Sequence, residues 1–145
     1  MSGCSYTFIV FELKFLIANF LANSNAYTGG TNITSGRFQI GASNAIASSS
    51  ALTFTGSGGD MFFLAGNIQQ TIGSFISHNS APRVDLASAR LIINSSSNET
   101  FNATIVGVNG SGKIIKQGAG RLSLRNAGIS NRVLLQDESS SLDYI

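Results

Sequence analysis

Charge is what this sequence has least of. Asp, Glu, Lys and Arg make up only 11% of its 145 residues, and the formal net charge is +2, whereas typical globular domains carry about 25% charged residues. Solubility must therefore come from the abundant Ser, Thr and Asn residues. Lys113, Lys116, Arg121 and Arg125 form a mild basic zone, but no aromatic residues interleave them for base stacking. We interpret this zone as solvated turns and expect no nucleic-acid partner.

Proline, cysteine, histidine and tryptophan are also scarce, with one, one, one and none of each. A lone Cys4 excludes an intrachain disulfide and a thiolate metal cluster, and a lone His78 excludes a three-histidine metal site. One Pro beside 16 Gly suits many short strands and tight turns, because Pro removes ladder hydrogen bonds and Gly supplies positive φ angles. Disorder is excluded because apolar residues, 43% of the chain, recur to its end.

Short apolar segments are what the sequence has in quantity. From residue 37 onward they begin about every ten residues, several with period two, between Gly, Asn and Ser residues. The segments are 37–40, 52–55, 62–65, 74–76, 83–86, 91–93, 101–106, 113–115 and 121–124. Such strands fit a sandwich or a solenoid. Their similar lengths and short linkers favour a parallel β-helix, in which coils pair at about 4.8 Å and apolar residues stack inward.

The most apolar run, residues 6–22, leaves two interpretations open. It is either the hydrophobic region of a signal peptide, with residues 24–26 as the cleavage site, or a helix or strand that covers one end of the core. No Lys or Arg precedes the run, and Glu12 and Lys14 lie inside it. Those two charges also argue against a membrane span of about 20 clean apolar residues.

Three motifs resemble those of one known family. They are NAYTGGT at 25–31, GRFQIG at 36–41 and GSGKIIKQGAGRLSL at 110–124, with strand pairs such as 70–75 and 89–93 between them. In this order they resemble the autotransporter-associated β-strand repeat, also called the passenger-associated transport repeat. The resemblance covers about residues 21–128. After residues 126–128 the expected Y-T-G-G is absent, so we expect a piece of a larger passenger.

The resemblance implies an all-β, right-handed parallel β-helix that forms a secreted or surface-displayed stem at the bacterial outer membrane. It implies no catalytic, cofactor or metal site. The implied partners are neighbouring coils, a C-terminal β-barrel translocator not found in this chain, and host or cell-surface ligands. Open strand edges could also self-associate. We expect an apolar N-terminal segment at 1–22, which could be a short helix, a repeat region at 23–128 and a polar tail or truncated repeat at 129–145.

Four other patterns suggest chemistry only weakly. The G-x-x-x-x-G-K stretch at 107–113 lacks the Ser or Thr and the helix that a P-loop needs, so we expect strand and turn there. A single Gly/Asp loop at 56–60 is a tight turn rather than a calcium site. His78 and Asp85 lack a G-x-S-x-G nucleophile turn. The N-x-S/T sites at Asn32, Asn94, Asn98, Asn102 and Asn109 are a product of the composition.

Carboxylates support the alternative function, a carbohydrate-binding or carbohydrate-cleaving β-helix of the tailspike or pectin-lyase type. In such a protein Asp60, Asp85 or Glu99 would line a groove, and two of them would converge in one exposed cleft, as carboxylate catalysis requires. We interpret them instead as lone acids at turns. The sequence therefore predicts a non-catalytic structural and adhesive module.

Overall fold

The computed structural model describes residues 18–21, 29–34, 36–55, 61–64, 66–77, 82–107, 111–129, 133–137 and 142–144. Every regular element in these ranges is a strand. The strands are β1 (Ala18–Leu21), β2 (Thr31–Ile33), β3 (Arg37–Ile40), β4 (Ala51–Phe54), β5 (Met61–Leu64), β6 (Gln69–Ile72), β7 (Ser74–Ser77), β8 (Arg83–Asp85), β9 (Arg90–Asn94), β10 (Glu99–Val106), β11 (Gly112–Gln117), β12 (Leu122–Ile129), β13 (Val133–Asp137) and β14 (Leu142–Tyr144).

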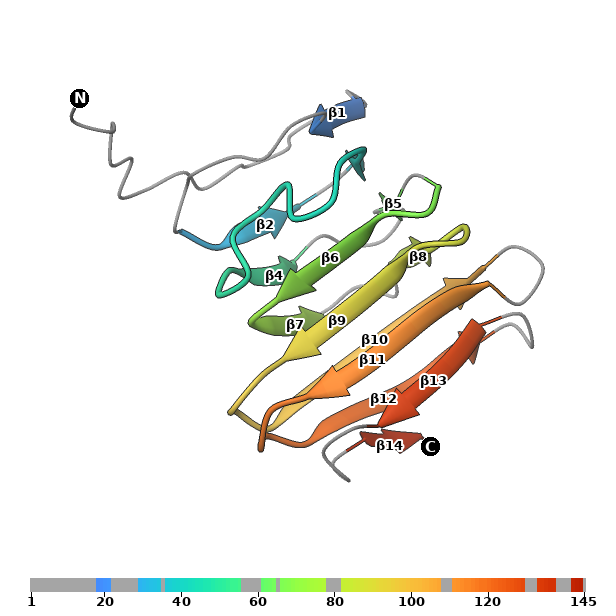
Figure 1. The fold of residues 1–145 in the computed structure, drawn as a ribbon. Coiled ribbons are helices and arrows are strands. Elements are labelled where there is room, and N and C mark those ends of the chain that lie inside the picture. Colours follow the sequence, from blue (N-terminus) through green and yellow to red (C-terminus); the bar gives the residue numbers. More distant parts are fainter. Residues whose placement is uncertain are drawn as a thin grey trace.

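The strands form three parallel sheets, which confirms the predicted solenoid. One sheet has seven strands in the order β1-β3-β5-β8-β10-β12-β14, one has four in the order β13-β11-β9-β6, and one has three in the order β2-β4-β7. The chain leaves each sheet and returns one place further along, so successive coils lie on one another (Figure 1). Hydrogen bonds between side chains and the backbone of neighbouring coils join residues 21 to 26 positions apart. The right-handed sense stays a prediction, in line with the preference of parallel crossovers for that hand.

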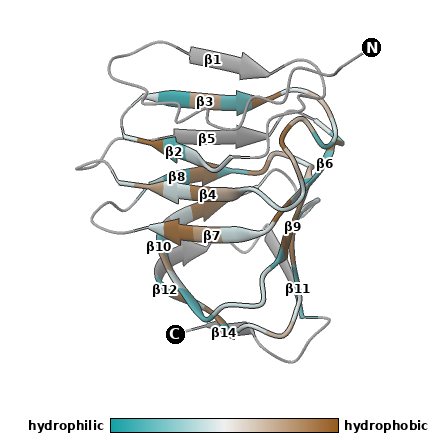
Figure 2. Ribbon diagram, turned by 90° about the vertical axis from the view of Figure 1, so that its left-hand side faces the viewer, coloured by the Kyte–Doolittle hydropathy of each residue, from teal (hydrophilic) through white to brown (hydrophobic). Residues whose placement is uncertain are grey.

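Each apolar segment predicted from residue 37 onward coincides with a strand, from β3 to β5 and from β7 to β12. In the short strands residues alternate between the interior and the surface, as in β4, where Leu52 and Phe54 are fully buried and their neighbours are half-buried. β9 and β11 differ, because each buries three consecutive residues. Figure 2 shows the stacked strands with their hydrophobic positions. The period-two pattern therefore marks the residues that face the core.

The cross-section of the coil changes at β10. This strand shifts register between Asn102 and Thr104. Its second part pairs with β8 in the seven-stranded sheet, while its first part lies against β7, the last strand of the three-stranded sheet. The Ser77 hydroxyl bridges this junction, because it donates to the Asn102 carbonyl (3.1 Å) and accepts from the Asn102 amide (2.8 Å). Two of the three sheets thus merge at one irregular strand.

Three phenylalanines from three successive coils fill the interior at this junction. The rings of Phe75 and Phe101 stack with centroids 3.6 Å apart, and Phe54 meets Phe101 edge-on at 5.6 Å. All three side chains are fully buried. Each such side chain contributes about 1.5–3 kcal/mol through its removal from water, so this column is a major part of the core.

The turns stack as closely as the strands. Gly118 has a φ of +78°, and a Cβ added there would lie 2.5 Å from the Ser95 carbonyl oxygen of the coil before. Gly36 has a φ of +90° between β2 and β3. The stretch 26–41 is thus a strand–turn–strand corner over its described residues, as predicted, and Gly36 is a turn residue rather than a ligand.

Both ends of the chain add strands to the sheets. Residues 18–21 form β1, which pairs with β3, so the helix interpretation of the apolar run is wrong for these four residues. Residues 6–17 lie outside the described ranges, as does the proposed cleavage site. β13 and β14 come from the segment expected to be a tail or a truncated repeat, and the division into three regions stays a prediction. Among the described residues no helix is long and apolar enough to cross a membrane.

Candidate functional site

The two described acids that sequence analysis singled out do not converge. Glu99 begins β10, whereas Asp85 pairs with Val106 at the other end of the same strand. A strand rises about 3.3 Å per residue, so the ends of this eight-residue strand lie on the order of 20 Å apart. Glycoside hydrolysis needs carboxyl groups about 5–10 Å apart. Asp85 and Glu99 are therefore too far apart to form a catalytic dyad. Asp60 lies outside the described residues.

Asp85 fits the interpretation as a turn acid, and Glu99 does not. Asp85 accepts a hydrogen bond from the Ala87 amide at 3.0 Å, in the turn that follows β8. Glu99 is only 8% exposed. Its carboxylate accepts hydrogen bonds from the Ser74 hydroxyl (2.5 Å), the Ser95 hydroxyl (2.9 Å) and the Phe75 amide (2.9 Å). The Glu99 carboxylate on β10 therefore satisfies the Phe75 amide of β7, and it is shielded from solvent.

The interpretation of the basic zone as solvated turns is likewise wrong for Lys116, because its side chain is fully buried. In register it follows the inward residues Ile72 and Ile93 of the neighbouring coils. Its apolar stem continues that column, and its Nζ donates to the carbonyls of Ser95 (3.4 Å), Gln117 and Gly118 (3.0 Å). Burial lowers the pKa of Lys116, and the charges of Asp137 and Glu99 oppose that shift.

Glu99 and Lys116 meet through a shared residue. The Ser95 hydroxyl donates to Glu99 while the Ser95 carbonyl accepts from Lys116. We call Ser74, Ser95, Glu99 and Lys116 the Ser95 cluster. Its hydrogen bonds connect three successive coils, and Ser95, Glu99 and Lys116 are buried while Ser74 is half-buried, so the cluster joins coils to one another. The alternation Gly112, Ile114, Lys116 places the lysine on the inward face, a signal in the sequence that could have revealed it.

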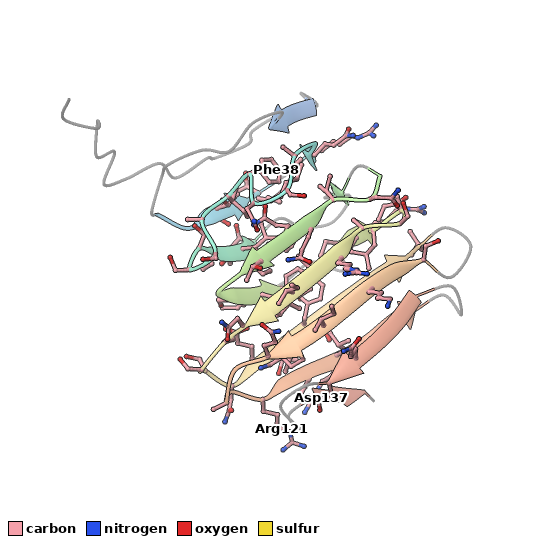
Figure 3. All side chains as sticks on the ribbon, viewed as in Figure 1. Phe38, Arg121 and Asp137 are labelled. Carbon is pink, nitrogen blue, oxygen red and sulfur yellow. The ribbon has the colours of Figure 1, made fainter. Side chains whose placement is uncertain are left out.

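The other residues of the basic zone reach the surface. Arg121 and Arg125 are exposed, and Figure 3 shows Arg121 pointing away from the sheets near the C-terminal end. Lys113 stands on β11, which begins at Gly112 and runs as strand and turn into β12 as predicted. Phosphate binding at a P-loop needs a helix at this place, and residues 111–129 contain none.

The other sequence candidates have structural roles or lie outside the described residues. Asn98 Oδ1 accepts a hydrogen bond from the Arg121 amide at 2.8 Å, and Asn32 Oδ1 accepts one from the Thr55 hydroxyl at 2.9 Å. Asn102 is half-buried and Asn94 is exposed. The stretch 56–60, His78 and Asn109 are not described. No group of three His, Cys, Asp or Glu that could hold a metal occurs among the described residues.

The surface depressions over the described residues include two that are polar in lining or shallow. The larger, about 350 Å³, lies where β6, β9 and β11 begin and is lined by Asn67, Ile68, Gln69, Ser88, Arg90, Ser111 and Lys113. The smaller, about 240 Å³, lies over β2 and β4 and is lined by Gly30, Thr31, Asn32 and Thr53. Neither contains an acid, a histidine or a cysteine, so neither offers a general acid or base of those types.

The family model described as Passenger-associated-transport-repeat matches residues 20–40. The chain carries a passenger-associated transport repeat. In the structure the matched stretch is one coil, because Phe20 on β1 pairs with Gln39 on β3 and Leu21 pairs with Ile40. The family resemblance is thereby confirmed for this coil. No curated protein and no solved structure gave a significant match to the chain. The passenger-associated transport repeat and the β-solenoid together fit a segment of an autotransporter passenger.

Proposed function

We propose that this chain is a non-catalytic structural segment of a secreted or surface-displayed autotransporter passenger at the bacterial outer membrane. The observation that carries the proposal is that the passenger-associated transport repeat spans one coil, and that further coils continue it in the same register. A stack of this kind acts as a stem, because each coil hydrogen-bonds to the next and the load passes along the ladder.

The geometry also supports folding outside the cell as the chain emerges. Within each sheet, every strand after the first pairs with one in the coil before, and the residues that hydrogen-bond neighbouring coils are 21 to 26 positions apart. Solenoids fold from any coil and propagate to neighbours, so a new coil can add to a formed one without waiting for distant sequence. Neighbouring coils and a C-terminal β-barrel translocator are the partners of this proposal, and ligands on host or cell surfaces are those of an adhesive role.

A display experiment tests the stem. The chain is placed between a signal peptide and an autotransporter β-barrel in a Gram-negative host, and intact cells are treated with a protease. We expect surface exposure, measured with antibody, and resistance to the protease because the coils are folded. The variant Phe101→Ala should cost about 3–5 kcal/mol and reach the surface in a protease-sensitive form. Equal sensitivity of the two proteins would contradict a folded stem.

The carbohydrate-cleaving alternative is tested separately. Purified protein is incubated with polygalacturonate, and new reducing ends are measured with the variants Asp85→Asn and Glu99→Gln as controls. Because Asp85 on β8 pairs with Val106, at the opposite end of β10 from Glu99, we expect no cleavage above buffer. Cleavage that is lost in either variant would reject the structural proposal in favour of an enzyme.

A further inference from the structure

The larger depression carries an arrangement of charge that the stem does not need. Arg90 on β9 and Lys113 on β11 are direct partners in the parallel register, and Gln69 on β6 precedes them in the same column. Adjacent strands lie about 4.8 Å apart, and like charges directly opposite destabilise a sheet. The ion pair between Arg83 and Asp85 (3.6 Å) involves β8, which belongs to a different sheet from these two cations. The lining of the depression contains no acid, so the two cations repel one another there without a neutralising group, in a chain that is otherwise poor in charge.

The surroundings of the two cations are those of a small polar binding site. Arg90 is exposed and Lys113 is half-exposed, so both can reach a ligand. The other lining groups are the amides of Asn67 and Gln69, the hydroxyls of Ser88 and Ser111, and the side chain of Ile68. The volume of about 350 Å³ lies at the lower end of the range for ligand pockets, about 300–1,000 Å³. This is room for one sugar-sized group.

We propose that this depression binds an acidic sugar unit of a polysaccharide, with Arg90 and Lys113 on its carboxylate or sulfate group. Guanidinium and ammonium groups bind oxyanions through charge-assisted hydrogen bonds, and the guanidinium can do so in a bidentate manner. The amides and hydroxyls of the lining suit the neutral hydroxyl groups of the same unit. The lining contains no aromatic side chain, so stacking on nucleic-acid bases is not favoured. This site goes beyond the proposed stem function, and neither depends on the other.

The test uses the full chain and titrates it at low ionic strength with tetragalacturonate and with a sulfated tetrasaccharide. The variant Arg90→Gln/Lys113→Gln should bind whichever acidic sugar binds the wild type at least about tenfold more weakly, because hydrogen bonds to charged groups are lost. The matched control Arg121→Gln/Arg125→Gln removes the same charge from exposed positions elsewhere and should change the affinity less than twofold. Added salt should weaken the wild-type interaction, and neutral maltotetraose should bind at least tenfold more weakly.

Several results would overturn the proposal. One is no binding of either acidic sugar at millimolar concentration. Another is an equal loss of affinity in the control variant, which would indicate a general effect of net charge. Inorganic sulfate that binds as tightly as the oligosaccharides would leave a bare oxyanion site, and single-stranded oligonucleotide that binds as tightly would indicate a polyanion surface. Circular dichroism checks that each variant is folded. Because relief of the repulsion favours the sheet, the double variant at positions 90 and 113 should unfold at the same temperature as the wild type or higher.

Discussion

At the scale of single residues, the Ser95 cluster shows how a charge-poor chain uses two of its few charges. Glu99 and Lys116 are buried where backbone groups lack strand partners: Glu99 accepts from the Phe75 amide, and Lys116 donates to carbonyls in the turns. A buried charge is costly unless it is compensated; here hydrogen bonds satisfy both groups, and the negative charge of Glu99 favours the charged form of Lys116. The two residues act as substitutes for ladder hydrogen bonds at the place where the sheets merge.

Glu99→Gln tests whether this carboxylate replaces ladder hydrogen bonds, with almost no change in the shape of the side chain. The amide has one acceptor oxygen and a donating NH₂ group, so it cannot accept from Ser74, Ser95 and the Phe75 amide together. We expect a loss of about 1.5–3 kcal/mol in the free energy of unfolding, measured by urea denaturation. Ser96→Ala, at an exposed position of the adjacent turn, is the control and should change stability by less than about 0.5 kcal/mol. A Glu99→Gln variant as stable as the wild type would show that the three bonds contribute nothing.

Lys116→Met retains the apolar stem and removes the donor. Because carbonyls in two turns lose a hydrogen bond and Glu99 loses a nearby cation, we expect a loss of about 1–3 kcal/mol at neutral pH. Lys113→Met, on the outward face of the same strand, should change the free energy of unfolding by less than about 0.5 kcal/mol. Denaturation curves for the three proteins decide this.

The difference in stability between the wild type and Lys116→Met should also depend on pH. Burial lowers the pKa of Lys116 below its ordinary value of 10.5, so in the window between the two values the unfolded chain binds the proton more tightly than the folded chain. In that window the free energy of unfolding rises with pH. The stability difference between the wild type and Lys116→Met should therefore grow as pH rises toward 10.5. A difference that shrinks over this range would show that the folded protein favours the charged amine.

At the scale of elements, the strands were easier to predict than the turns and the junction. Alternating apolar residues found β3, β4 and β8 because one face of each strand is buried. β6 reads Gln-Gln-Thr-Ile, and composition alone did not mark it as a strand. In the structure, the buried Gln70 uses its amide to bond the Ile46 amide and carbonyl of the loop before (3.2 and 2.9 Å). Such a role depends on what lies across the coil, and no local pattern contains that information.

Gly118→Ala tests how closely the turns of neighbouring coils stack. A Cβ added there would lie 2.5 Å from the Ser95 carbonyl oxygen, and the φ of +78° adds strain. The stacked turns would have to separate, so Gly118→Ala should cost more than about 2 kcal/mol. Gly66 has a similar φ of +52° with nothing within 4 Å, so Gly66→Ala carries the strain alone and should cost about 1–2 kcal/mol. Thermal unfolding that affects both variants equally would show that turn stacking is not tight.

At the scale of the whole molecule, the ten-residue spacing of apolar segments was correct but does not correspond to one coil. It reflects successive strands in different sheets, such as β4 in the three-stranded sheet and β5 in the seven-stranded sheet. The segments that pair are further apart, as in Leu52 with Phe75. The solenoid was therefore predictable from short similar strands. The pairing register and the merging of two sheets at β10 were not, because both depend on contacts between coils.

A stack of coils also predicts how stability is distributed along the chain. Interior strands such as β8 and β10 have a neighbour on each side, whereas β1 and β14 end the seven-stranded sheet among the described residues. In solenoids each repeat is stabilised by its neighbours, so amide hydrogen exchange should be slowest in β8 and β10 and should quicken toward both ends. Unpaired edges bind other strands, so raising the protein concentration should slow exchange in β1 and β14 and leave the interior unchanged. Uniform exchange along the sheet would contradict the stacked-coil account of stability. Exchange rates in β1 and β14 that do not change with protein concentration would contradict end-to-end association.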